Sequence, residues 1–252
     1  MMNLRAFTRA IEISEHGPAG SPESHRHANT YAAIVLQGEY TEISADGKMV
    51  ARPGDLVVHP AFHWHTNVFT TSAVKVLNLK LPIAAGVCVP YGRLPLAELP
   101  LSQDDIVHYP DEGAAAIIKL CGLYGAAENQ RAENDRLGTV RQHLNRPRAL
   151  KVRQIAADVG MSAEHLARQF RARYGLSPVE YRGEYRFRHA VRELFAGQTA
   201  AVAACNSGYS DQSHMSRDIR LRIGMTPRQL QSYLKPDASR HVPCRASRQQ
   251  QA

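Results

Sequence analysis

The pattern of apolar and polar positions divides the chain into a β-rich front half and a helical back half. Residues 31–81 contain short runs rich in Val, Ile, Leu and Tyr, such as YAAIVLQGEYTEIS and AVKVLNLKL, with turn residues at Asp46-Gly47 and Pro53-Gly54 between them. Many short strands with frequent turns predict a β-barrel or sandwich. From residue 149 onward the apolar spacing is helical except at short turns.

In the segment between the two halves, the spacing of apolar residues changes to that of a helix. Residues 112–127 read EGAAAIIKLCGLYGAA and place Ile117, Ile118, Cys121 and Tyr124 at helical spacing. This helix can pack on the barrel or on a second subunit. A polar stretch that ends at Pro147 then predicts a linker with room for one helix.

The helical half contains a repeat. GMSAEHLARQFRARYGLSP (160–178) and GYSDQSHMSRDIRLRIGMTP (208–227) share one plan, and both the Arg168/Arg217 and the Gly175/Gly224 pairs are 49 residues apart. Such a period suggests a duplicated supersecondary unit.

Each unit has the signals of a helix-turn-helix. In the first, an apolar helix ends near Gly160, Ser162 can cap the next helix, and Leu166 and Phe170 share its inner face. In the second unit, Met215 and Ile219 take the inner positions. At 100° per residue the outward positions are then Glu164, His165, Arg168, Arg171, Ser213, His214, Arg217 and Arg220, with Gln212 near a helix start.

A basic, amide-bearing helix face is suited to a DNA major groove. Arg can bind guanine O6 and N7 there, and Gln can bind an adenine edge. The alternative is an ordinary helical bundle with surface arginines, but two copies at one period argue against it.

The distribution of charge supports the same division. The chain has 252 residues and a formal net charge of +8, but residues 1–100 hold 8 basic and 8 acidic side chains, whereas residues 141–235 hold 17 basic and 7 acidic ones. Only the back half is therefore expected to bind a polyanion such as DNA.

These motifs resemble a known family. Residues 150–233 are similar to the double helix-turn-helix DNA-binding domain of the AraC/XylS family of bacterial transcription regulators, through IAADVGMSAEHLARQFRARYGLSPVEYRGEYRFRHAVREL and GYSDQSHMSRDIRLRIGMTPRQL. The second unit departs from the family pattern at Met215, Ile219 and Leu230, where aromatic residues are usual. The resemblance implies base contacts at Glu164, Arg168, Gln212, Ser213, Ser216 and Arg217, with His165 and His214 at phosphate or at the helix flank.

The resemblance also implies a cupin-like barrel in front of the DNA-binding domain. The cupin pattern finds GSPESHRHANTYAAIVLQG, with His25 and His27 in place and Tyr31 where Glu is usual. The second cupin motif finds GDLVVHPAFHWHTNVF, with Phe62 in place of Gly and with His65 in place.

Three histidines make a divalent metal site plausible on chemical grounds. His25 and His27 share a strand face, and the second motif would bring His65 to the same point, where three imidazoles suit zinc, iron, nickel or copper. His63 is a fourth ligand or none, and His59 is expected at a strand end. The alternative is that these histidines line an effector pocket with Tyr31, Tyr40, His63 and Trp64.

We therefore expect an α+β protein of two domains, a cupin-like β-barrel with flanking helices and an all-α double helix-turn-helix. The expected segments are a sensor at 1–110, a helical dimerisation or linker segment at 111–140, the DNA-binding domain at 141–235 and a disordered tail at 236–252.

The expected function is sequence-specific transcription regulation in response to a small-molecule or metal effector. The expected partners are double-stranded promoter DNA, a second copy of the chain and RNA polymerase. The rival hypothesis is a cupin-type metalloenzyme whose basic helical domain serves only for localisation. The sequence has no long apolar run and no signal-type N-terminus, so the chain is expected in the cytoplasm, outside any membrane, and without a CxxC pair its cysteines are expected to be reduced. It is expected not to be an enzyme, because the front half names no substrate or general base and the DNA-binding repeat favours a sensor domain.

Overall fold

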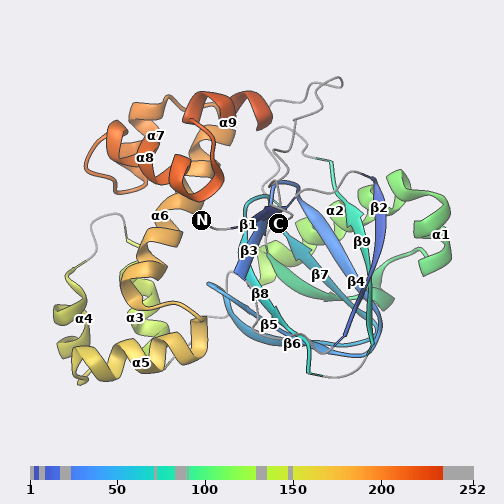
Figure 1. Ribbon diagram of the computed structural model, residues 1–252, viewed down its shortest axis with the longest axis horizontal. Coiled ribbons are helices and arrows are strands. Elements are labelled where there is room, and N and C mark those ends of the chain that lie inside the picture. Colours follow the sequence, from blue (N-terminus) through green and yellow to red (C-terminus); the bar gives the residue numbers. More distant parts are fainter. Residues whose placement is uncertain are drawn as a thin grey trace, which may run out of the picture.

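The computed structural model describes residues 3–5, 9–17, 24–70, 73–82, 89, 91–128, 135–146 and 150–234. The expected tail at 236–252 and part of the expected linker lie outside these residues. The β-rich front half and the helical back half lie side by side (Figure 1). No helix of the described ranges combines the length and the apolar character needed to cross a bilayer.

The front half consists of two five-stranded sheets, antiparallel except where β1 pairs with β3. One sheet has the order β1-β3-β8-β5-β6 and the other β10-β7-β4-β9-β2. The strands are β1 (Asn3–Arg5), β2 (Ile11–His16), β3 (Ser24–His27), β4 (Tyr31–Gln37), β5 (Tyr40–Ser44), β6 (Gly47–Ala51), β7 (Asp55–His59), β8 (Trp64–Val68), β9 (Val74–Lys80) and β10 (Gly92–Pro95). The predicted cupin-like β architecture is confirmed.

The central strands of the second sheet, β7, β4 and β9, are buried on both faces. Along β4, Tyr31, Ala33 and Val35 face the interior between the sheets, and Ala32 and Ile34 face outward into a separate apolar cluster. Helices cover that outer face, which explains why YAAIV is an unbroken apolar run and does not alternate with polar residues.

The covering helices are α1 (Gln103–His108) and α2 (Pro110–Glu128), preceded by the 3-10 turn η1 (Leu96–Glu98). Ile106, Ile117 and Cys121 are buried in the cluster outside β4. Of the two alternatives for this segment, α2 packs on its own barrel; the side chain of Tyr124 lies outside the described part. Ser102 caps α1 through a capping box with Asp105.

The described residues of the back half form helices joined by short turns. Its helices are α3 (Arg136–Leu144), α4 (Val152–Asp158), α5 (Ala163–Tyr174), α6 (Pro178–Phe195), α7 (Ala200–Asn206), α8 (Gln212–Ile223) and α9 (Pro227–Leu234). The predicted repeat is visible in the backbone, because α5 and α8 each have 12 residues and end at a left-handed glycine, Gly175 (φ 69°) and Gly224 (φ 72°).

The helix α6 connects the two units (Figure 1). It begins as predicted with Ser177 as cap and Pro178 in the first turn, and Glu180 completes a capping box. Tyr181, Ala190 and Leu194 are buried as expected, whereas Tyr185 is only partly buried. Three further residues, Pro178, Glu184 and Phe187, complete the buried face.

Candidate functional site

The outer face of α5 carries the expected base-contacting residues of the first unit. Leu166 and Phe170 are fully buried, and Ser162 Oγ accepts a hydrogen bond from the His165 backbone N–H at 3.2 Å. This anchoring leaves Glu164 and Arg168 exposed, with Arg168 Nη2 3.0 Å from His165 Nδ1. The tip of α5 is thus available to an external partner.

The second unit repeats this arrangement in α8. Met215 and Ile219 are fully buried, so these aliphatic side chains fill the positions where the family pattern has aromatic residues. Asp211 caps the helix by accepting from the His214 backbone N–H at 2.7 Å. Gln212, Ser213 and Arg217 are exposed, and Ser216 is half-buried.

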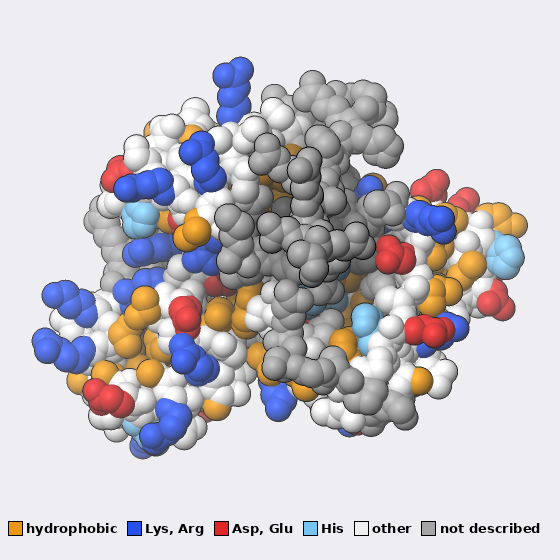
Figure 2. All heavy atoms as spheres, in the orientation of Figure 1, with side chains coloured by type: hydrophobic (Ala, Val, Ile, Leu, Met, Phe, Trp, Pro, Cys, Tyr) orange, Lys and Arg blue, Asp and Glu red, His pale blue; other side chains and the backbone are white. Residues whose placement is uncertain are grey.

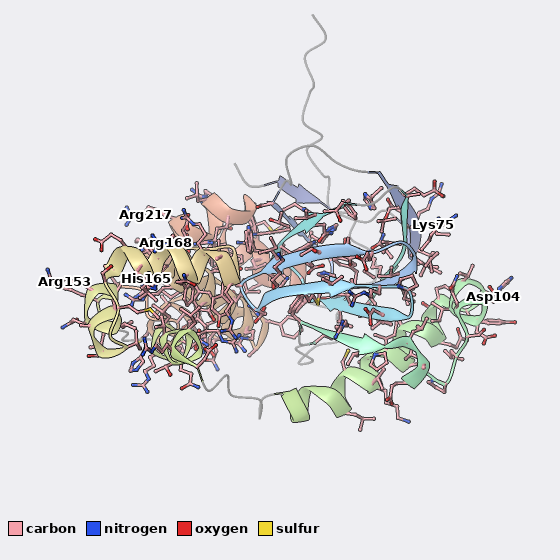
Figure 3. All side chains as sticks on the ribbon, turned by 90° about the horizontal axis from the view of Figure 1, so that it is seen from below. Lys75, Asp104, Arg153, His165, Arg168 and Arg217 are labelled. Atoms are coloured by element: carbon pink, nitrogen blue, oxygen red, sulfur yellow. The ribbon has the colours of Figure 1, made fainter. Side chains whose placement is uncertain are left out.

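Basic side chains gather over the helical half on the face seen in Figure 2. In Figure 3 the labelled Arg153, His165, Arg168 and Arg217 all lie on the helical half, and Lys75 and Asp104 lie on the opposite half of the molecule. The expected DNA-contacting residues therefore share one part of the structure.

Inside the barrel, the three predicted histidines come together. His25 on β3 is paired in register with His65 on β8, and their ring centroids are 4.3 Å apart. The His27 ring lies 5.0 Å from that of His25 and 5.5 Å from that of His65. One nitrogen from each lies within 4.8 Å of the others, so modest contraction would allow Zn–N bonds of about 2.0–2.1 Å. These residues fit a divalent transition metal.

The four expected pocket residues do not all lie in this cluster. Tyr31 does, with its Oη 3.3 Å from His65 Nε2, and His63 lies at its edge with a ring centroid 6.0 Å from that of His65. Tyr40 packs farther along the same interior, against Phe69. Trp64 points the other way, because neighbours on a strand alternate, and its ring lies against the turn at Gly175.

Two residues of the cluster were not among the sequence-predicted ligands, Glu42 on β5 and His59 on β7. Both are buried, and His59 Nε2 lies 3.0 Å from both carboxylate oxygens of Glu42. His59 does end its strand as expected, but it also faces inward. The sequence does contain a clue to the position of Glu42, because residues two apart on a strand share a face. Tyr40 and Glu42 are therefore expected on the same, interior face.

Protonation in the cluster favours ligand chemistry. Burial lowers the pKa of His65 well below its ordinary value, and the surrounding histidines add to this shift. Burial alone would raise the pKa of Glu42, but His59 and His63 more than offset it, so the pKa lies below its usual value. A neutral imidazole and an ionised carboxylate are the forms that bind metals.

The cluster is adjacent to the contact between the two halves. Arg26, between the two histidines of β3, faces away from them and donates to the Glu184 carboxylate on α6 at 2.9 and 2.5 Å. Arg222 on α8 donates to the same carboxylate at 3.0 Å. One buried carboxylate therefore joins β3, α6 and α8.

A second link runs through the turn between β5 and β6. Asp46 Oδ2 lies 3.0 Å from His63 Nε2 and accepts from Arg188 of α6 at 2.7 Å. Arg188 and His63 together hold the pKa of Asp46 far below its usual value, although burial acts in the opposite direction. A residue at the edge of the histidine cluster is thus connected to the central helix of the back half.

Comparison with known proteins agrees with both halves. A family model described as a cupin domain matches residues 13–79, and one described as a helix-turn-helix domain matches residues 155–233. The bifunctional transcriptional activator/DNA repair enzyme Ada of Escherichia coli (strain K12) is 27% identical over 103 residues, which is 41% of this chain. The aligned region spans 29% of Ada's length.

Two solved structures are also similar. Wild-type ToxT from Vibrio cholerae strain SCE256, with an unsaturated fatty acid bound, is 10% identical, with 91% of this chain and 97% of that chain covered and a TM-score of 0.42. A transcriptional regulator of Chromobacterium violaceum with an AraC-type DNA-binding domain is 25% identical, with 43% of this chain and 96% of that chain covered and a TM-score of 0.36.

Proposed function

We propose that this chain is a transcription regulator that binds specific promoter sequences and responds to an effector bound in its barrel. The chain is a member of the AraC family and joins an N-terminal cupin domain to a C-terminal helix-turn-helix domain. The observation that carries the proposal is the duplication of an anchored helix, α5 and α8, with exposed Arg168 and Arg217 at equivalent positions. Two such helices joined by α6 can enter successive major grooves, about 34 Å apart on one face of the duplex.

Arg168→Ala and Arg217→Ala are each expected to weaken binding to the cognate operator by about 1–3 kcal/mol, because each removes a bidentate contact to a base. Binding to random DNA should change much less. Gel shifts or anisotropy at fixed salt on both DNAs measure the two effects. Lys75→Ala, on the opposite half of the molecule, is the matched control and should leave both affinities unchanged (Figure 3).

Equal losses on operator and random DNA would instead identify the two arginines as phosphate contacts. The rival hypothesis of a metalloenzyme with a basic localisation domain predicts no sequence preference at all. Screening the full chain at moderate salt against upstream DNA regions therefore separates the two functions.

The effector is proposed to bind in the barrel interior, as a metal ion among the buried histidines around His65 or as a small molecule beside Tyr31 and His63. What supports this is the burial of a polar, aromatic cluster inside an otherwise apolar barrel. His25 and His27 face the pocket from one side of β3, and Arg26 on the other side of the strand binds Glu184 of α6. An effector that moved β3 would therefore also move the contact with α6.

Asp46→Asn is expected to reduce coupling between pocket and DNA. The substitution keeps the shape but removes the charge that holds Arg188, so occupancy of the pocket should affect operator affinity less. The measurement is the ratio of operator affinities with and without Zn²⁺, where coupling of about 5–150-fold is usual for allosteric proteins and the variant ratio should approach one. Asp104→Asn on α1 is the control, and a variant ratio equal to that of the parent chain would contradict the role of Asp46.

The proposed regulator acts in the cytoplasm as a homodimer, with RNA polymerase as a further partner at the promoter. Leu123, which is 66% exposed on α2, and the partly buried Ile118 supply apolar surface for contact with a second copy.

A further inference from the structure

We propose that Glu42, His59 and His65 form a binding site for a divalent transition metal ion inside the barrel. In this site β5 supplies the carboxylate that is missing from β4, where Tyr31 stands. The ligand class is two imidazoles and one carboxylate, which suits Fe²⁺ and Zn²⁺. Mg²⁺ and Ca²⁺ prefer all-oxygen ligands and are disfavoured.

The geometry brings the three groups together from both sheets. Glu42 on β5 and His65 on β8 come from neighbouring strands of one sheet, and His59 on β7 comes from the other. One ligand atom from each lies within 4.8 Å of the other two. An ion at this point would therefore join the two sheets across the barrel interior.

Burial argues that this cluster has a role beyond packing. Glu42 and His65 are fully buried and His59 is 1% exposed. Removing an ionised carboxylate from water costs several kcal/mol, which a cation beside it offsets. His59 also keeps its buried Nδ1 without a hydrogen-bond partner among the described residues, although its Nε2 faces Glu42.

Charge favours this set over the three histidines predicted from the sequence. His25, His27 and His65 would hold a divalent ion with neutral ligands only, leaving two positive charges in a buried site. Glu42 cancels one of them, which lowers the cost of burying the ion. Since both sets use His65, one imidazole is common to either arrangement.

The inference rests on the proposed sensor role of the barrel, because it names the class of effector. The experiment below measures only the affinity of the chain for a metal ion. Operator binding by the metal-free chain tests the DNA-binding function separately. The two proposals can therefore fail independently.

The experiment is titration of the full metal-free chain with Zn²⁺ in competition with a chromophoric chelator. Glu42→Gln and His65→Gln should each lower the affinity by more than about 100-fold, because loss of a ligand exceeds the 10–100-fold cost typical of an outer partner. His25→Gln, which removes a ligand of the three-histidine set only, should stay within about 10-fold of the parent chain.

The inference is overturned if the parent chain binds no Zn²⁺ or if Glu42→Gln retains the parent affinity for Zn²⁺. It is also overturned if His25→Gln loses that affinity, because an ion that needs His25 lies in the three-histidine set. Far-UV circular dichroism of each metal-free variant checks folding. Should Glu42→Gln fail to fold, His59→Gln takes its place, with the same expected loss and the same overturning result.

Discussion

Glu184→Ala is expected to lower the free energy of unfolding by about 3–5 kcal/mol, because it leaves a buried arginine without its counter-charge. Arg26 is 1% and Glu184 2% exposed, so water cannot replace the lost carboxylate. Arg26 also lies over the Phe187 ring, with its guanidinium carbon 4.8 Å from the centroid. Arg222 keeps a second partner in Asp218 at 2.9 Å.

Denaturant unfolding followed by circular dichroism and by fluorescence measures this effect. Trp64, the sole tryptophan, is buried and lies against Gly175, so its emission reports on the contact between the two halves. Arg26→Met combined with Glu184→Met should recover most of the loss, because an apolar pair of similar volume replaces the ion pair. Glu15→Ala, which breaks an exposed pair with Lys75, should change stability by less than about 1 kcal/mol. A Glu184→Ala effect as small as that of Glu15→Ala would refute the argument.

The same carboxylate gives a pH dependence of known sign. Burial would raise the pKa of Glu184, but Arg26, Arg222 and Arg188 outweigh it and hold the pKa below its usual value of 4.5. A group whose pKa is lowered by folding stabilises the fold above its unfolded pKa and loses that contribution as the pH falls through its folded pKa. The stability contributed by Glu184 should therefore be complete above about pH 4.5 and decline below it. In Glu184→Ala the free energy of unfolding should therefore fall less steeply below about pH 4.5 than it does in the parent chain.

Phe62→Ala is expected to lower the free energy of unfolding by about 3–5 kcal/mol, the usual range for truncating a buried aromatic residue. Phe62 belongs to the barrel half, but its ring is 1% exposed in a cluster with Phe187, Ala190 and other residues of the helical half. Its truncation opens a cavity at the contact between the halves.

Phe62→Gly separates the backbone contribution from that of the ring. Phe62 has φ 62°, the left-handed region where the cupin motif places glycine and where a side chain is strained. Phe62→Gly should therefore be about 1 kcal/mol more stable than Phe62→Ala, although both lose the ring. Leu221→Ala, at a leucine that is 74% exposed, is the control for truncation of an apolar side chain. Equal stability of the glycine and alanine variants would mean that the backbone is not strained at this position.

The helical half was largely predictable, because its signals are local. Ser162, Ser177 and the glycines at 160, 175 and 224 mark helix ends through contacts within a few residues, and the structure places the helix boundaries there. The inward positions of α5 and α8 followed from the 3.6-residue period alone. The contact residues on DNA remain a prediction, since they depend on a partner outside the chain.

The interior of the barrel was predictable only in part. The register of β3 and β8 brings His25 and His65 together, as the motifs indicate. Glu42 and His59 were not predicted as neighbours, because a strand pattern gives the face of each residue but not which strands lie opposite each other. The expected place of Trp64 in the pocket is wrong for a different reason: neighbours on a strand alternate, so Trp64 lies on the face opposite His65, and its ring packs against Gly175 of the helical half.

The sequence by itself determined two domains, the duplicated recognition helix and the three-histidine set, because each depends on residue types at fixed local spacing. Only the tertiary structure decided that a carboxylate joins the histidines and that Arg26, Asp46 and Phe62 connect the barrel to α6. These are pairings between residues up to 158 positions apart, such as Arg26 with Glu184. A charged residue in a sequence is expected at the surface, and it becomes a buried link only when the fold places its counter-charge beside it.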